Sequence, residues 1–114
     1  MKKAVTLKKN YEFQRMYRKA KSAVSPCVVV YCRNNHLDHN RIGITVSTKL
    51  GKAVVRNRAR RRLREAYRLQ AAHIRPGCDF VMVARGRLLS APWHQVCAQL
   101  RQCMDRLGVW EERV

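Results

Sequence analysis

Residues 49–68 read KLGKAVVRNRARRRLREAYR and combine an apolar stripe with a dense set of arginines. Seven arginines occupy the thirteen residues 56–68. The stripe can pack against a sheet while the guanidinium groups, which are planar and bidentate, face a polyanion. Nucleic acid is therefore the first partner to consider. The apolar residues recur at helical spacing and line one side of a predicted α-helix: Val55, Ala59, Leu63, Ala66 and Tyr67.

The charge of the whole chain points the same way. Its 25 Lys and Arg residues against 7 Asp and Glu residues leave a net charge of +18 on 114 residues. Such self-repulsion opposes compaction and suits a protein with a polyanionic partner. The basic residues are spread along the chain, and 46% of all residues are hydrophobic, so we expect residues 1–114 to form one basic folded domain.

The sequence does not favour a membrane protein. No apolar run approaches the roughly 20 residues of a membrane span, and the N-terminal MKKAVTLKKNYEF lacks the apolar segment of a secretory signal. The predicted helix carries two alanines in its stripe, whereas helices that lie on membranes have a bulkier apolar face. We expect a cytoplasmic protein with no membrane association.

Cysteine and histidine spacing predicts no metal site. The 5 cysteines include no CxxC pair and are expected to be reduced and mostly buried. His36, Asp38 and His39 lie in NNHLDHN, whose composition is typical of a turn between two strands. We favour the turn over a cluster of metal ligands, since no other Cys or His spacing completes a zinc site.

Periodicity predicts further helices and strands on both sides of the arginine-rich helix. A first helix runs from Asn10 to about Lys21. Alternating runs predict strands at 27–33 and 41–47, and the nearly continuous apolar run 78–85 is typical of a central strand. A final helix is expected with Ser90 as its N-cap, Pro92 in its first turn and Gly108 at its end.

These elements predict an α+β sandwich in which helices cover one sheet face. If the first helix lies at the sheet edge, Phe13 and Tyr17 would stand beside the outward-facing Tyr31 and Arg33. That grouping would form a cleft of aromatic rings with positive flanks, which suits single-stranded nucleic acid. Alternatively, Phe13 and Tyr17 are core residues, because aromatic pairs four residues apart on a helix often pack together.

Residues 41–68, RIGITVSTKLGKAVVRNRARRRLREAYR, closely resemble the signature region of the protein subunit of bacterial ribonuclease P. The hallmark is an Arg-Asn-Arg triplet in the helix that follows a strand and a glycine-containing turn. Residues 7–22 and 78–104 resemble the family's first helix and its last strand and helix. The resemblance implies a single-domain αβββαβα sandwich with a mostly antiparallel central sheet and a left-handed βαβ crossover, against the usual rule.

The resemblance also implies a partner for each surface. The arginine-rich helix would contact the catalytic RNA subunit, and the cleft would hold the single-stranded 5′ leader of precursor tRNA. The expected catalytic-RNA contacts are Arg56, Asn57, Arg58, Arg60, Arg61 and Arg64. The expected cleft residues are Phe13, Tyr17 and Tyr31, with Arg15, Arg18 and Arg33 as neighbours.

The resemblance places the chemistry in the RNA. It implies that the RNA holds the Mg²⁺ ions that support leader removal, while the protein is one subunit of an endonuclease and hydrolase. The seven acidic residues show no close inward-facing pair, which disfavours an autonomous nuclease. We expect a monomeric protein in a 1:1 ribonucleoprotein. The rival interpretations are a ribosomal or generic RNA-binding protein and a nuclease that needs no RNA subunit.

Overall fold

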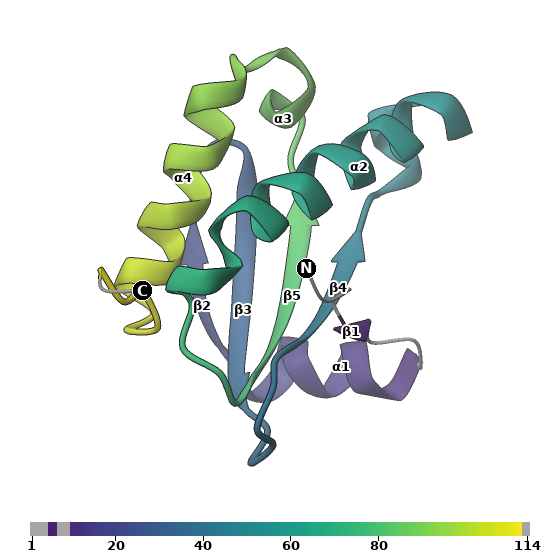
Figure 1. Cartoon of the computed structure of the whole chain (residues 1–114). Helices are drawn as coiled ribbons and strands as arrows, with labels where there is room; N and C mark the ends of the chain where they lie inside the picture. The colour runs from purple at the N-terminus through teal and green to yellow at the C-terminus, as the bar shows by residue number, and fades with distance from the viewer. Residues whose placement is uncertain (1–4, 7–9, 113–114) are drawn as a thin grey trace.

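The protein folds into one mixed sheet with helices on both of its faces (Figure 1). The computed structural model describes residues 5–6 and 10–112. The first half contains β1 (Val5–Thr6), α1 (Asn10–Lys19), β2 (Lys21–Val24), β3 (Val28–Asn34), β4 (Arg41–Thr45) and a 3-10 turn at Thr48–Leu50. The second half contains α2 (Ala53–Gln70), a 3-10 turn at Ala71–His73, β5 (Cys78–Ala84), α3 (Arg87–Ser90) and α4 (Trp93–Arg106).

The strands lie in the order β1-β4-β5-β3-β2. The longest ladder, β3 with β5, and the β2–β3 ladder are antiparallel, whereas β4 runs parallel to both β1 and β5. The apolar run 78–85 thus forms a central strand, as predicted. Two rows of residues cross the sheet on the same face: Arg33, Asp79 and Arg41 in one, and Tyr31, Val81 and Gly43 in the next.

α2 connects the adjacent parallel strands β4 and β5. In Figure 1 both arrows point upward, α2 crosses in front of the sheet, and β5 lies to the left of β4. A right-handed connection in this view would move to the right. The crossover is therefore left-handed, which agrees with the expectation.

The main core lies between the sheet and the pair α2 and α4. β3 contributes Val28, Val30 and Cys32, in the predicted alternation. The predicted stripe of α2 is confirmed, because Ala59, Leu63, Ala66 and Tyr67 are buried and Val55 is half-buried. The stripe of α4 is likewise core: Val96, Leu100, Cys103 and Met104 are buried.

α1 covers the opposite face of the sheet. Met16 packs on Val81 of β5, together with the half-buried Phe13, Ala20 and Tyr31. The prediction that helices cover one sheet face therefore holds for α2 and α4 but not for α1, which lies behind the sheet in Figure 1. The alternation of β3 explains this arrangement, since Tyr31 and Val29 point away from the main core.

The boundaries of two predicted helices were wrong. α1 ends at Lys19, because residues 21–24 pair with β3 instead. Ser90 does not cap the final helix; it closes the short helix α3, and Pro92 occupies the N-cap position of α4. The physical reason is Pro92, which keeps the preceding Ala91 out of the helical region and separates the two helices (ψ 143°).

Other predictions about local structure hold. Residues 35–40 form a turn, in which the side chains of Asn34 and Asn35 accept hydrogen bonds from the main-chain N–H groups of His36 and Leu37. All five cysteines are free thiols, four of them buried, and burial raises the pKa of Cys32 to about 12. Gly108 ends α4 with a positive φ of 78°. Within the described residues, no helix is long and apolar enough to cross a membrane.

Candidate nucleic-acid interface

α2 presents its arginines on the side that faces away from the core. Gly51 makes the entry to this helix possible, because its φ of 144° suits glycine and a Cβ there would lie 3.1 Å from Val55. Beyond this turn, burial of Ala59 and Leu63 fixes the rotation of the helix about its axis. Positions 57, 61, 64 and 68 then follow each other along the outer surface. The polar side of α2 is therefore rigidly aimed at solvent.

The arginines of α2 fall into two groups. Arg58, Arg61 and Arg64 are exposed and have no hydrogen-bond or ion-pair partner within the described part of the chain. Arg60 is half-buried and donates to Oδ1 of Asn57 at 3.1 Å. Arg56 is half-buried, and its buried Nε has no partner among the described residues. The predicted contact residues thus leave several guanidinium groups available to phosphates.

Arg62 belongs to the second group, because it is used inside the protein. Its Nη1 donates to the carbonyls of Leu88 at 2.9 Å and Leu89 at 3.2 Å, and its Nη2 donates to Ala91 at 2.9 Å. Its guanidinium also lies 5.7 Å from the ring centroid of Trp93. Arg62 therefore fastens the end of α3 and the start of α4 to α2. The sequence prediction left Arg62 out of the contact set but did not predict this role.

Arg68 is also paired within the helix. It forms a bidentate ion pair with Glu65 one turn earlier, with Nε to Oε2 at 2.8 Å. This pair lowers the pKa of Glu65 through the hydrogen bonds from Arg68. Glu65 therefore neutralises the charge of Arg68 within the arginine-rich helix.

The predicted aromatic cleft residues lie together between α1 and the sheet. The rings of Tyr17 and Tyr31 meet edge to face, with centroids 5.1 Å apart and planes at 74°. The hydroxyls of Tyr17 and Thr45 share a hydrogen bond of 3.1 Å. Phe13 packs beside Met16 in the same cluster. Met16 is the buried residue of this helix, whereas Tyr17 remains 42% exposed. The alternative that Phe13 and Tyr17 are core residues therefore holds only in part.

The three predicted basic neighbours lie in different places. Arg15 and Arg18 are exposed on the outer side of α1, and the guanidinium of Arg15 lies 6.0 Å from the ring centroid of Tyr11. Arg33 is half-buried, two residues from Tyr31 on the same face of β3. The structure therefore brings Arg33 toward the aromatic cluster and turns Arg15 and Arg18 away from it.

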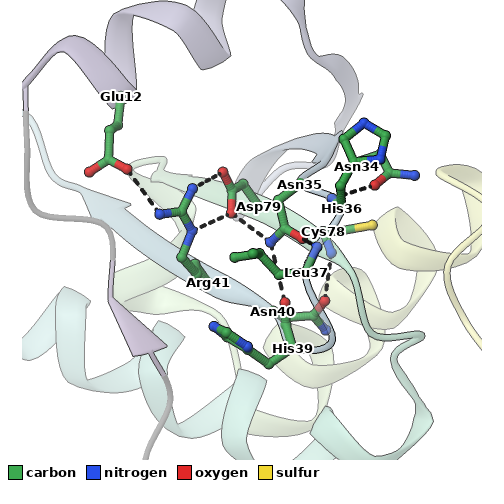
Figure 2. Close-up of polar contacts among 10 residues, drawn as sticks. All are labelled: Glu12, Asn34, Asn35, His36, Leu37, His39, Asn40, Arg41, Cys78 and Asp79. Atoms are coloured by element: carbon green, nitrogen blue, oxygen red, sulfur yellow. Dashed lines mark hydrogen bonds and ion pairs between the residues drawn. The ribbon is translucent and has the colours of Figure 1, made fainter.

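A polar network adjoins the cleft, and the sequence prediction missed it. Figure 2 shows Arg41 between Glu12 of α1 and Asp79 of β5. Arg41 donates to Asp79 through Nε at 2.8 Å and Nη2 at 2.7 Å, while its Nη1 lies 3.2 Å from Glu12 Oε2. Asn35 donates to Oδ1 of Asp79 at 2.9 Å. The network joins elements that are far apart in the chain.

The Asp79 carboxylate is kept charged in this network although it is buried. Burial by itself would raise the pKa of Asp79, but the hydrogen bonds from Arg41 and Asn35 outweigh it and leave the pKa below its ordinary value. The same contact with Asp79 raises the pKa of Arg41. Both charges of the ion pair therefore persist at neutral pH.

The carboxylates of the described residues offer no evident metal site. The described residues contain no group of three His, Cys, Asp or Glu side chains placed to hold a metal ion. Glu12 and Asp79 contact Arg41, Glu65 contacts Arg68, and Glu112 contacts Arg101. These residues do not fit a resident Mg²⁺ ion, because their oxygens are already engaged by guanidinium groups.

The folded domain thus has an arginine-covered helix on one face of the sheet and an aromatic cluster on the other. The family model for Ribonuclease P matches residues 1–108. The chain belongs to the ribonuclease P protein family. As a ribonuclease P protein component, it is part of an endoribonuclease that contains RNA, and its family acts in tRNA processing.

Relatives of the ribonuclease P family match over nearly the whole chain. The ribonuclease P protein component of Thermoanaerobacter sp. (strain X514) is 44% identical over 108 residues, which span 95% of this chain and 93% of the relative. That of Clostridium acetobutylicum is 48% identical over 105 residues, which span 90% and 88%.

Solved structures of ribonuclease P proteins share the fold. The Staphylococcus aureus protein superposes with a TM-score of 0.83 at 37% identity, covering 96% of this chain and all of that one. The Thermotoga maritima protein gives 0.81 at 30% identity, covering 89% and 96%. An S. aureus variant described as defective in mRNA degradation gives 0.82 at 37% identity, covering 92% and 89%.

Proposed function

We propose that this protein holds two RNAs at once: the catalytic RNA of ribonuclease P on α2 and the 5′ leader of precursor tRNA in the cleft beside α1. The observation that supports this proposal is that the unpaired arginines and the aromatic cluster lie on opposite faces of one sheet. A rigid domain with two separate RNA surfaces can align a substrate with a ribozyme.

On α2, the proposed contacts are electrostatic. Arg58, Arg61 and Arg64 reach phosphates directly, and Arg56, Asn57 and Arg60 support them from the same helix. Each guanidinium can bind two phosphate oxygens and releases counterions from the RNA. These contacts reduce the repulsion between catalytic RNA and substrate RNA, and they anchor the protein.

In the cleft, the proposed contacts combine stacking with hydrogen bonding. Tyr17 and Tyr31 offer ring surface to unpaired bases, Phe13 closes the apolar side, and Arg33 supplies positive charge. A mature tRNA has no leader to occupy the cleft. Binding there therefore favours precursor over product.

Leader removal would depend on Mg²⁺ held mainly by the RNA subunit. Carboxylates of the protein such as Glu12, Asp79 and Glu65 contact arginines, so in this proposal they hold no Mg²⁺ ion at the scissile phosphate. The protein would act as a monomer in a 1:1 ribonucleoprotein in the cytoplasm. Its contribution is to substrate selection and to assembly of the complex.

A cleavage assay tests the assignment of the chemistry. Precursor tRNA is incubated in Mg²⁺ with the protein alone, with the catalytic RNA alone and with both. We expect efficient cleavage with both and none with the protein alone, because the described residues contain no group of three His, Cys, Asp or Glu side chains placed to hold a metal ion. Cleavage by the isolated protein would favour an autonomous nuclease. The same assay should include an mRNA substrate, because an S. aureus relative is described as a variant defective in mRNA degradation.

Substitutions separate the two RNA surfaces. Arg58→Ala should weaken binding to the catalytic RNA and reduce the slope of log affinity against log salt by about 0.7 to 0.9, the value for one lost phosphate contact. Phe13→Ala and Tyr17→Ala should instead reduce the preference for precursor over leaderless tRNA. An unchanged salt slope would remove Arg58 from the RNA interface, and an unchanged preference would contradict the leader cleft. A generic RNA-binding protein would show no leader preference at all.

A further inference from the structure

α1, which forms one wall of the proposed cleft, is attached to the sheet by a small apolar cluster and by polar contacts. Among its ten described residues, Met16 alone is buried. Two side chains of α1 reach β4: Glu12 contacts Arg41 at 3.2 Å, and Tyr17 contacts Thr45 at 3.1 Å. The position of the wall therefore depends on these polar contacts as well as on the small apolar cluster around Met16.

Arg41 is the fixed end of the first contact. Two of its nitrogens hold Asp79 in a bidentate pair, and the Asp79 side chain is only 8% exposed. Asn35 holds the same carboxylate from the turn that follows β3, and also donates to the carbonyl of His39 at 3.2 Å. The guanidinium thus has little freedom to rotate, and its remaining nitrogen is presented to Glu12 (Figure 2).

Glu12 occupies a position where its placement matters. It is the acidic residue in the first turn of an otherwise basic helix, and Phe13 of the cleft follows it directly. The Glu12 side chain is only 18% exposed, so its charge is partly removed from water beside Arg41. A partly buried pair with fixed geometry resists displacement better than a mobile surface pair.

We propose that Arg41 is a positioning residue for the leader cleft: anchored by Asp79, it pairs with Glu12 and holds α1 at the spacing that lets the cleft grip single-stranded RNA. This inference rests on the proposed function of the cleft. Stacking and hydrogen bonding to RNA bases require side chains held to within a fraction of an ångström. Loosening one end of α1 therefore weakens the grip on the leader without removing any ring.

The proposal has a consequence that a charge effect would not produce. Glu12→Gln makes the protein more positive, so nonspecific attraction to RNA should increase. Loss of positioning should nevertheless reduce selective binding of the leader. The two effects have opposite signs, and the selectivity ratio therefore reports on positioning.

The experiment measures affinities of the reconstituted protein–RNA complex for precursor tRNA and for leaderless tRNA. Glu12→Gln leaves the Arg41–Asp79 pair intact, and Arg41→Lys keeps the charge but loses the bidentate geometry. We expect both variants to lower the precursor preference about fivefold, which corresponds to about 1 kcal/mol. Glu112→Gln is the matched control, since it also removes a carboxylate from an arginine, Arg101, and should leave the ratio unchanged.

A structural measurement on the free protein accompanies the affinities. NMR contacts between the rings of Tyr17 and Tyr31, whose centroids are 5.1 Å apart, should weaken in Glu12→Gln while contacts in the main core persist. Affinity for the catalytic RNA should not fall, because α2 lies on the other face. A general loss of folding would instead weaken the main-core contacts and the affinity for the catalytic RNA together.

The outcomes separate this inference from the function on which it rests. A precursor preference in Glu12→Gln equal to that of Glu112→Gln, together with a reduced preference in Tyr17→Ala, would overturn the positioning role alone. An unchanged preference in Tyr17→Ala and Phe13→Ala would overturn the leader cleft and this inference with it.

Discussion

α1 and α2 are both basic helices packed on the same sheet, but α2 is held by far more hydrophobic burial. α2 buries four residues, Ala59, Leu63, Ala66 and Tyr67, in the main core. α1 buries Met16 alone, with Phe13 and Ala20 half-buried beside it, and adds polar contacts such as Glu12–Arg41. Full burial of a leucine or methionine side chain contributes about 1.5 to 3 kcal/mol, and α2 buries three further side chains beside its leucine. Hydrophobic burial therefore fixes α2 more firmly than α1.

This difference suits the two proposed roles. A helix that docks on a large structured RNA benefits from a rigid base, because its arginines must match many phosphates together. A cleft wall that meets a flexible single strand is adjusted by a few polar contacts. Four predictions test the contrast, ordered from the largest expected effect to the smallest.

The largest effect is expected when a buried side chain of α2 is truncated. Leu63→Ala should lower the free energy of unfolding by about 3 kcal/mol, because it leaves a cavity under a fully buried side chain. Chemical denaturation followed by circular dichroism measures this loss. The whole domain should be affected, since Leu63 lies in the core shared by α2 and the sheet.

Met16→Ala is the matched substitution under α1. It should accelerate amide hydrogen exchange in α1 while exchange in α2 stays slow, because Met16 belongs to the separate small cluster with Val81. Equal acceleration in both helices would show that the two faces of the sheet unfold as one unit, and the contrast between them would be wrong.

The third prediction distinguishes two arginines that are adjacent in sequence. Arg62→Ala should destabilise the fold by about 2 kcal/mol, because three main-chain carbonyls at the end of α3 lose a charged donor. Arg61→Ala, on the exposed side, should leave thermal stability unchanged and weaken binding to the catalytic RNA. If Arg61→Ala proved as destabilising as Arg62→Ala, the division of α2 into structural and RNA-facing arginines would fail.

The smallest effect concerns pH. The pKa of Asp79 is lower in the folded protein than the value of about 3.9 expected for an unfolded chain. Its ion pair therefore contributes stability fully above about pH 4, and this contribution is lost as pH falls through the lower folded pKa. Thermal melts between pH 7 and pH 2 should show a weaker acid dependence for Asp79→Asn than for the unchanged protein. An identical acid dependence would mean that protonation of Asp79 does not cause the loss of stability at low pH.

Much of the fold was predictable because each helix and strand has a repeating apolar pattern. The stripe of α2, the alternation of β3 and the continuous run of β5 all matched the elements observed. The errors arose where one residue overrode the pattern. Pro92 moved the start of the final helix to Trp93 and left Ser90 at the end of α3, and the short pairing of residues 21–24 with β3 ended α1 early.

The candidate site was predictable only in part, for a related reason. Helical spacing placed the arginines of α2 on one surface but could not show that Arg62 would meet carbonyls of α3, a helix that was not predicted. Strand alternation placed Tyr31 on the open face. It could not place Arg41 between Glu12 and Asp79, because these residues come from three elements whose neighbours depend on strand order.

The amino-acid sequence by itself determined that the chain is a basic α+β domain with an arginine-covered helix, because charge and periodicity are local properties of neighbouring residues. Only the tertiary structure decided which arginines remain available to RNA and how α1 is held over the cleft. Those features depend on contacts between residues tens of positions apart, such as Glu12 with Arg41 and Arg62 with Leu88, and such contacts exist only after the sheet has brought its strands together.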